Sequence, residues 1–214
     1  MFGEIAPTYD LLNHLLSAGQ DIRWRRRAIA RLCPRAGGRV LDLCCGTGDS
    51  TREVLRQQPR CEVVGADFSL PMLEVARHKE LPDLACADAL RLPFGDGTFD
   101  ATMAAFGARN FADTRAGLAE MFRVTKAGGR LMILEFMRPT SRALSRGAGN
   151  VLLAPLGRLI SGHGSAYKYL PQSIDGFTTR AEFEDLLREV GWRDVRLFDH
   201  ALGVATSFLA VKRG

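Results

Sequence analysis

Three aspartates follow three short apolar runs in the first half of the chain. The run 39–44 leads through a glycine turn to Asp49, the run 61–66 ends at Asp67, and the run 84–87 ends at Asp88. A single aspartate in such a place is more often a helix cap or a turn residue. Three of them after successive strands would meet at one edge of a parallel sheet, where open α/β sheets bind their ligands. Carboxylates gathered in this way favour a ligand that carries positive charge.

The turn Gly46-Thr47-Gly48 lies between the first apolar run and a predicted helix. Glycines let a ligand approach the backbone, and the start of the helix offers free N–H groups. A dinucleotide site would need a third glycine where this chain has Thr51, and Asp49 would repel a pyrophosphate. Asp42, inside the strand, adds a further negative charge. S-adenosylmethionine, which has an ammonium and a sulfonium, therefore fits this turn better than a dinucleotide does.

Asp67 and Asp88 complete this interpretation. Asp67 follows Gly48 by about twenty residues, the spacing at which a carboxylate accepts hydrogen bonds from both ribose hydroxyls of a nucleotide. Asp88-Ala89 would lie beside an adenine edge. The three strand ends together predict a site for an adenosine-containing cation.

A sheet has to bring these residues together, and the chain alternates strands with helices in the way that builds one. Such alternation predicts an α/β fold with a mostly parallel central sheet and helices on both faces. We expect Ser69 to cap a helix that has Pro71 in its first turn, and Ala127-Gly128-Gly129 to close another. The expected strands are 39–44, 61–66, 84–87, 99–106, 130–136, 192–198 and 204–212, and the expected helices include 50–57, 113–125 and 180–190.

Two segments lie outside this alternation. Residues 10–32 predict helices that break near Gly19, with the arginines 23–31 on a solvated face. Residues 138–176 break the rhythm after the fifth strand and form a predicted insertion or lid, in which the apolar stretch 151–160 is flanked by arginines. That insertion fits an interfacial segment and an ordinary lid about equally. We expect one domain, 1–214, with a helical cap at 1–36. The flanking arginines are Arg138, Arg142, Arg146 and Arg158.

Composition sets the broad class of protein. The 214 residues are 46% hydrophobic and 25% charged with a net charge of +5, which is typical of a globular chain rather than a disordered one. The five cysteines include no CxxC pair, so we expect buried, reduced thiols and no metal site. No secretory signal and no membrane span are evident, so the expected location is the cytoplasm.

Longer motifs carry a family resemblance. The run Leu41-Asp-Leu-Cys-Cys-Gly-Thr-Gly-Asp49 resembles the first motif of class I S-adenosylmethionine-dependent methyltransferases. The closer similarity is to the ubiquinone/menaquinone biosynthesis C-methyltransferases, and it spans nearly the whole chain. Phe106-Gly-Ala-Arg-Asn110 and the run from Tyr167 to Ile174 are its most specific parts. The chain departs from the family pattern at Ala127, at Thr178 and at His163, where the family often has an acidic residue.

The resemblance implies a Rossmann-like fold, S-adenosylmethionine as cofactor, and C-methylation of a prenylated quinol ring in menaquinone or ubiquinone biosynthesis. It implies that Arg109 stabilises the developing phenolate and that Asn110 orients a ring oxygen. Tyr167, Tyr169 and Ser173 would bind the acceptor, and the general base stays open between a water, His14, His163 and either tyrosine. The expected cofactor-binding residues are Asp42, Gly46, Thr47, Gly48, Asp67, Phe68, Asp88, Ala89 and Ala105.

Other functions remain open at this point. The same fold would serve a methyltransferase for another small molecule, because fold does not fix substrate. A nucleic-acid methyltransferase is disfavoured, since no aromatic-basic recognition module is visible. A non-catalytic cofactor-binding subunit is disfavoured by the presence of Arg109 and Asn110. The net charge of +5 suits any anionic surface and does not choose between nucleic acid and lipid, whereas the arginines around the apolar stretch 151–160 suit peripheral contact with an anionic membrane. The oligomeric state stays open, with a homodimer as one option.

Overall fold

The computed structural model describes residues 17, 19–79, 81, 83–138 and 172–214. The predicted lid lies outside these ranges except for its two ends, and so does the helix predicted before Gly19. The helices are α3 (Gln20–Leu32), α4 (Asp49–Gln57), α5 (Leu70–His78), η2 (Ala108–Asn110), α6 (Thr114–Val124), α9 (Arg180–Val190) and η4 (Ala201–Gly203). The strands are β1 (Arg39–Leu43), β2 (Glu62–Asp67), β3 (Asp83–Cys86), β4 (Phe99–Ala105), β5 (Thr125–Phe136), β6 (Arg193–His200) and β7 (Ala205–Val211).

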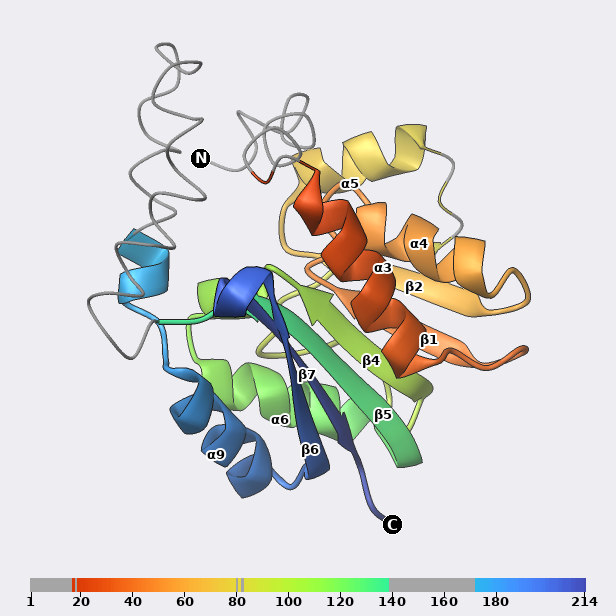
Figure 1. Ribbon diagram of the computed structural model, residues 1–214. Helices are drawn as coiled ribbons and strands as arrows, with labels where there is room; N and C mark the ends of the chain where they lie inside the picture. The colour runs from red at the N-terminus through yellow and green to blue at the C-terminus, as the bar shows by residue number, and fades with distance from the viewer. Residues whose placement is uncertain (1–16, 18, 80, 82, 139–171) are drawn as a thin grey trace, which may run out of the picture.

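Seven strands form one sheet in the order β3-β2-β1-β4-β5-β7-β6 (Figure 1). Strands β1 to β5 pair in parallel, and β7 runs antiparallel to both of its neighbours. The predicted mostly parallel α/β sheet is confirmed. After β3, at one edge of the sheet, the chain crosses β2 and β1 to reach β4. The strand order therefore reverses between β1 and β4, and ligands of such sheets bind at the carboxyl ends of the strands beside this reversal.

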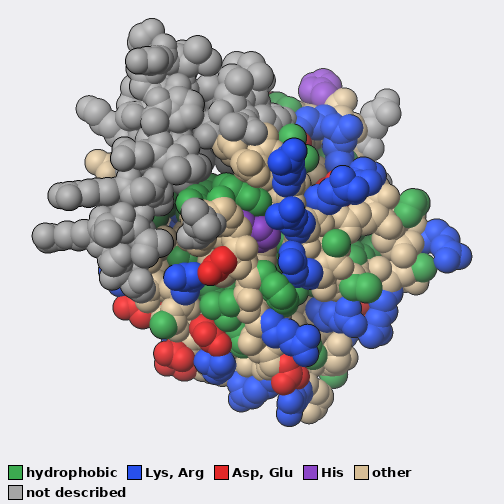
Figure 2. Space-filling model, in the orientation of Figure 1, with side chains coloured by type: hydrophobic (Ala, Val, Ile, Leu, Met, Phe, Trp, Pro, Cys, Tyr) green, Lys and Arg blue, Asp and Glu red, His purple; other side chains and the backbone are tan. Residues whose placement is uncertain are grey.

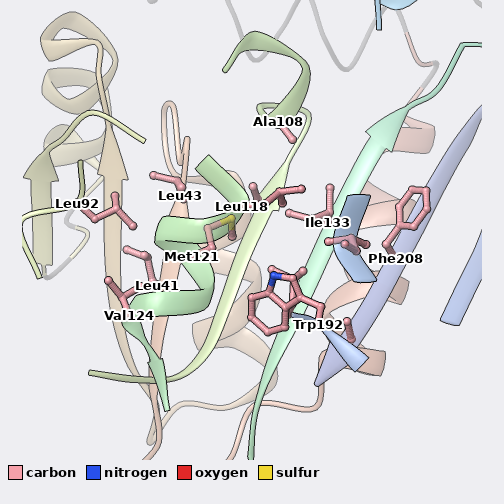
Figure 3. Packing of buried hydrophobic residues seen from close by; sticks show 14 of the residues in the cluster. Leu41, Leu43, Leu92, Ala108, Leu118, Met121, Val124, Ile133, Trp192 and Phe208 are labelled. Atoms are coloured by element: carbon pink, nitrogen blue, oxygen red, sulfur yellow. The ribbon is translucent and has the colours of Figure 1, made fainter. Parts of the chain in front are cut away.

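Helices cover both faces of the sheet because alternate strand residues point to opposite sides. Val40, Met132 and Leu134 pack with α3 and α4, whereas Leu41 and Ile133 pack with α6 and α9. Figure 3 shows the second of these layers, in which Leu118 of α6 and Ile133 of β5 belong to the same buried cluster as Trp192 and Phe208. Among the described residues, no helix is both long and apolar enough to cross a membrane.

Two local predictions are wrong and a third holds only in part. Ala127-Gly128-Gly129 does not close the preceding helix, because β5 already begins at Thr125 and reaches its regular register after an irregularity opposite Phe99–Ala101. Ser69 is the N-cap residue of α5 and Pro71 lies in its first turn, as predicted, although the Ser69 hydroxyl makes no capping hydrogen bond to that helix. All five cysteines are free, yet Cys33 and Cys86 are exposed rather than buried.

Candidate functional site

A cavity of about 370 Å³ opens at the carboxyl edge of the sheet. It lies where the three predicted strand ends meet, and its walls come from α3, from the loops after β1 to β4, and from α5. Of the residues predicted to bind a cofactor, this cavity brings together Gly46, Thr47, Asp67, Phe68, Asp88, Ala89 and Ala105. Its other lining residues are Arg25, Leu43, Cys44, Cys45, Asp49, Ser69, Met72, Ala87, Leu90, Phe106, Gly107, Asn110, Phe111 and Ala112.

The Asp67 carboxylate connects the loops after β1 and β2 at the cavity. Its carboxylate accepts the backbone N–H of Gly46 at 2.8 Å through one oxygen and that of Ser69 at 2.8 Å through the other. Burial raises the pKa of Asp67, and these backbone hydrogen bonds oppose the rise. Each carboxylate oxygen can accept a further hydrogen bond, so Asp67 can hold the glycine turn and a pair of ligand hydroxyls at once.

The turn after β1 uses left-handed backbone conformations at Cys44, Gly46 and Gly48, with φ of 57°, 56° and 88°. Gly48 does not line the cavity, and a side chain there would collide with Leu81, whose Cδ1 would lie 1.9 Å from the added Cβ. Its predicted contact with a ligand is therefore corrected to a role in shaping the turn and starting α4. Burial raises the pKa of the Cys44 and Cys45 thiols, which makes both cysteines poor nucleophiles here.

Asp42 is also displaced from the predicted site. Its side chain points from β1 to the face covered by α3 and α4, is fully buried, and accepts the Thr51 hydroxyl at 2.7 Å. It does not line the cavity. Burial raises the pKa of Asp42 to about 7, against a usual value of 3.8, while Thr51 and the nearby charge of Arg25 oppose the rise.

The Asp42 carboxyl should make the ligand-free protein less stable as the pH rises. Between about pH 4 and pH 7 the folded protein holds this proton while the unfolded chain releases it, so the free energy of unfolding falls as pH increases. Each unit of pKa difference corresponds to about 1.4 kcal/mol. We expect Asp42→Asn to flatten this slope in urea unfolding measured at several pH values, and the exposed control Asp83→Asn to leave it unchanged. An Asp42→Asn slope equal to that of the unaltered chain would contradict the assignment.

The opposite wall of the cavity follows β4. Phe106 has a φ of 63°, which is unfavourable for an aromatic residue, and its ring packs against Phe136 with centroids 4.7 Å apart. Gly107 lies so close to β1 that an added Cβ would stand 2.3 Å from the Cβ of Cys44, so a glycine is required there. Asn110, at the end of η2, lines the cavity as predicted for a residue that faces an acceptor.

Arg109 lies behind this wall rather than in it, because a buried carboxylate holds it. Glu135 projects from β5 toward the face covered by α6 and α9, and its Oε1 accepts Nη1 of Arg109 at 2.7 Å. The same Nη1 donates to the Phe106 carbonyl at 2.7 Å, and Nε donates to the Ser173 hydroxyl at 3.2 Å. Arg109 does not line the cavity. The structure places the guanidinium beside Glu135, Phe106 and Ser173, and the role of Arg109 toward the acceptor stays a prediction.

The predicted acceptor-binding residues divide in the same way. Ser173 contacts Arg109 behind the wall and does not line the cavity. Tyr167 and Tyr169 lie outside the described residues, as do His14 and His163, and so do three of the four arginines that flank the apolar stretch. The fourth, Arg138, forms an ion pair with Glu182 at 2.9 Å.

Arg25 is the lining residue that the sequence interpretation misplaced. The arginines of α3 were expected on a solvated face, but Arg25 turns inward and lines the cavity with a side chain that is 13% exposed. The spacing of apolar residues in this helix indicates the inward position, because Trp24 and Ala28 belong to its buried stripe and Arg25 lies beside that stripe. Asp49, also in the wall, forms an ion pair with Lys79 at 3.1 Å.

Comparison with known proteins agrees with this geometry. The sequence model of the ubiE/COQ5 methyltransferase family matches residues 1–212. The demethylmenaquinone methyltransferase of Thermus thermophilus is 48% identical over 200 residues, which covers 90% of this chain and 91% of that protein. The ubiquinone/menaquinone biosynthesis C-methyltransferase UbiE of Geobacter sp. is 42% identical over 222 residues and covers 99% and 94%.

A solved structure extends the comparison to the fold. A SAM-dependent methyltransferase from Thermotoga maritima superposes with a TM-score of 0.70 over 99% of this chain and 98% of that one. Its sequence is 20% identical, so this likeness concerns the fold alone. The described sheet and helices therefore have the Rossmann-like arrangement of class I methyltransferases.

Proposed function

This chain belongs to the ubiE/COQ5 methyltransferase family, and from that membership we propose that it methylates a ring carbon of a prenylated quinol with S-adenosylmethionine as donor. The observation that carries the proposal is the cavity itself, where the glycine turn, Asp67 and Asp88 from three successive strand ends form one wall. The chain is an S-adenosylmethionine-dependent C-methyltransferase of menaquinone or ubiquinone biosynthesis, and a non-catalytic subunit is not favoured.

The residues of the cavity fit the cofactor by their chemistry. When bound, S-adenosylmethionine supplies a methyl group activated by a sulfonium. Asp67 would accept the ribose hydroxyls, Asp88 and Ala89 would lie beside the adenine, and Phe68 would cover it. Phe106 and the backbone of Ala105 would border the methyl-transfer end of the cavity. Three carboxylates in the wall suit a ligand with two positive centres.

The acceptor would enter from the side of Asn110. Its amide can orient a ring oxygen, and Arg109, which donates to the Phe106 carbonyl, stays the group proposed to stabilise the developing phenolate. Neither residue is a good general base, because the side chain of asparagine is a neutral amide and arginine stays protonated in proteins. Catalysis by this chain would thus consist largely of holding the ring carbon in line with the methyl group and of excluding water.

Turnover tests the proposed function directly. The purified chain is expected to transfer a labelled methyl group from S-adenosylmethionine to reduced demethylmenaquinone, with the mass of one methyl group added to the ring. A benzoquinol with the same prenyl tail, assayed in parallel, decides which head group is accepted. Tight binding of S-adenosylmethionine without transfer to either quinol would refute the proposed acceptor class, and the assay of other small phenols would follow.

We further propose that the protein docks on an anionic lipid surface through α3, since a prenylated acceptor resides in lipid. The outer face of this helix exposes Arg23, Arg26 and Arg27, and no ion pair joins these three to an acidic residue in the part of the chain that the structure describes. Figure 2 shows the row of basic side chains that this face contributes to. Ile22, one turn before Arg25, is 49% exposed and would enter the interface.

Vesicle binding checks the docking proposal. Each basic residue near an anionic leaflet contributes about 1 kcal/mol, so the triple change of Arg23, Arg26 and Arg27 to Gln should lower cosedimentation with phosphatidylglycerol vesicles strongly at low salt. The control removes the same charge elsewhere, by changing Arg115, Arg180 and Arg188 to Gln. Equal loss in both triple variants would mean that net charge alone drives the association and that α3 has no special part.

A further inference from the structure

Arg25 is the one basic side chain in the described lining of the cavity, among Asp49, Asp67 and Asp88. The other charged residues of the lining are acidic, so Arg25 is the side chain there that can pair with a negative group of a ligand. Its position is set by the packing of α3, whose Trp24 and neighbouring apolar residues are buried against the sheet. A wall with carboxylates and one guanidinium matches a ligand that carries both positive and negative groups.

The guanidinium is fixed in place from three sides. Nη1 donates to the Ser50 hydroxyl at 2.8 Å, Cζ lies 5.1 Å from the centre of the Phe106 ring, and Nε lies 3.8 Å from Asp21. Nε is nevertheless buried without a hydrogen-bond partner among the described residues. Nε is closed off from the cavity, so a ligand would meet the part of the side chain that stays exposed, 13% of its surface.

The order of the strands tells which end of a bound cofactor Arg25 would meet. Asp88 follows β3, Asp67 ends β2, the glycine turn follows β1, and Phe106 follows β4, which is also their order across the sheet. Arg25 contacts Phe106 and therefore lies at the end of the cavity farthest from Asp88. If the adenosine lies over Asp67 and Asp88, the amino-acid end of the cofactor lies beside Arg25.

We infer that Arg25 binds the α-carboxylate of S-adenosylmethionine, an inference that rests on the function proposed above. A guanidinium presents paired N–H groups that match both oxygens of a carboxylate, which lysine cannot reproduce. The cavity would then hold the adenine at Asp88, the ribose at Asp67 and the carboxylate of the amino-acid end at Arg25.

The test compares S-adenosylmethionine with its decarboxylated form, which differs only in lacking that carboxylate. Binding of both ligands is measured by calorimetry for the unaltered protein, Arg25→Gln, Arg25→Lys and the control Arg31→Gln, which alters an exposed arginine on the same helix. We expect the unaltered protein to prefer the carboxylated ligand at least tenfold. Arg25→Gln should lose at least tenfold in affinity for that ligand and less than twofold for the decarboxylated one, with Arg25→Lys between the unaltered protein and Arg25→Gln, and Arg31→Gln unchanged.

Three outcomes would overturn the inference. Equal weakening of both ligands by Arg25→Gln would make Arg25 a residue that only supports Phe106 and Ser50. An unaltered protein that binds both ligands alike, yet methylates a quinol, would refute Arg25 as the carboxylate site and leave the proposed function standing. An unaltered protein that binds neither ligand would refute both. Should Arg25→Gln fail to fold, the Arg25→Lys comparison of the two ligands decides alone.

Discussion

Replacement of Glu135 by alanine is expected to lower the free energy of unfolding by about 3–5 kcal/mol, the usual cost of removing one partner from a buried ion pair. Glu135 is fully buried and Arg109 is 7% exposed, so the change leaves a guanidinium charge inside the protein without its carboxylate. It also removes an acceptor for the Arg109 backbone N–H at 3.2 Å. Denaturation with urea, followed by circular dichroism, measures the loss.

Two further variants separate charge from volume. Glu135→Gln keeps the shape of the side chain and removes only its charge, so most of the loss should persist if the ion pair is the cause. Glu184, which pairs with Arg188 on the surface of α9, provides the control, and Glu184→Ala should cost no more than about 1 kcal/mol. If Glu135→Ala and Glu184→Ala lowered the free energy of unfolding by the same small amount, the buried Glu135–Arg109 pair would not be an important source of stability.

Replacement of Asp67 by asparagine is expected to reduce affinity for S-adenosylmethionine by about 10- to 100-fold, since hydrogen bonds to charged groups contribute about 1.5–3 kcal/mol. Both carboxylate oxygens already accept backbone N–H groups, from Gly46 and from Ser69. An amide must turn its NH₂ toward one of these donors, so the variant loses charge and also loosens the glycine turn.

Calorimetry with S-adenosylmethionine and with S-adenosylhomocysteine measures this effect. Both ligands carry the ribose, so both should lose affinity by a similar factor, whereas the exposed control Asp83→Asn, at the other end of β3, should bind them normally. Normal affinity of Asp67→Asn for both ligands would show that the ribose does not lie at Asp67.

Local patterns in the sequence are enough to predict the sheet and the edge at which its cavity opens. Strand and helix positions follow from local periodicity, and a carboxyl end follows from the direction of the strand. The helix predicted at 180–190 is α9 as observed, and the strand directions alone predict that Asp67, Asp88 and the glycine turn share one edge, where the cavity opens. These assignments depend on residues near one another in the chain, which a single sequence displays directly.

Only the tertiary structure decided which way several charged side chains point. Asp42 and Arg109 both lie in motifs that predict a methyltransferase site. The Asp42 side chain, however, points to the sheet face covered by α4, where it accepts the Thr51 hydroxyl. Glu135, 26 residues after Arg109 in the chain, pairs with Arg109 and holds it behind the cavity wall. Arg25 enters the cavity because α3 packs across strands that follow it in the chain. Burial and charge pairing between distant segments set these directions, and no local pattern encodes which distant partner a charge will meet.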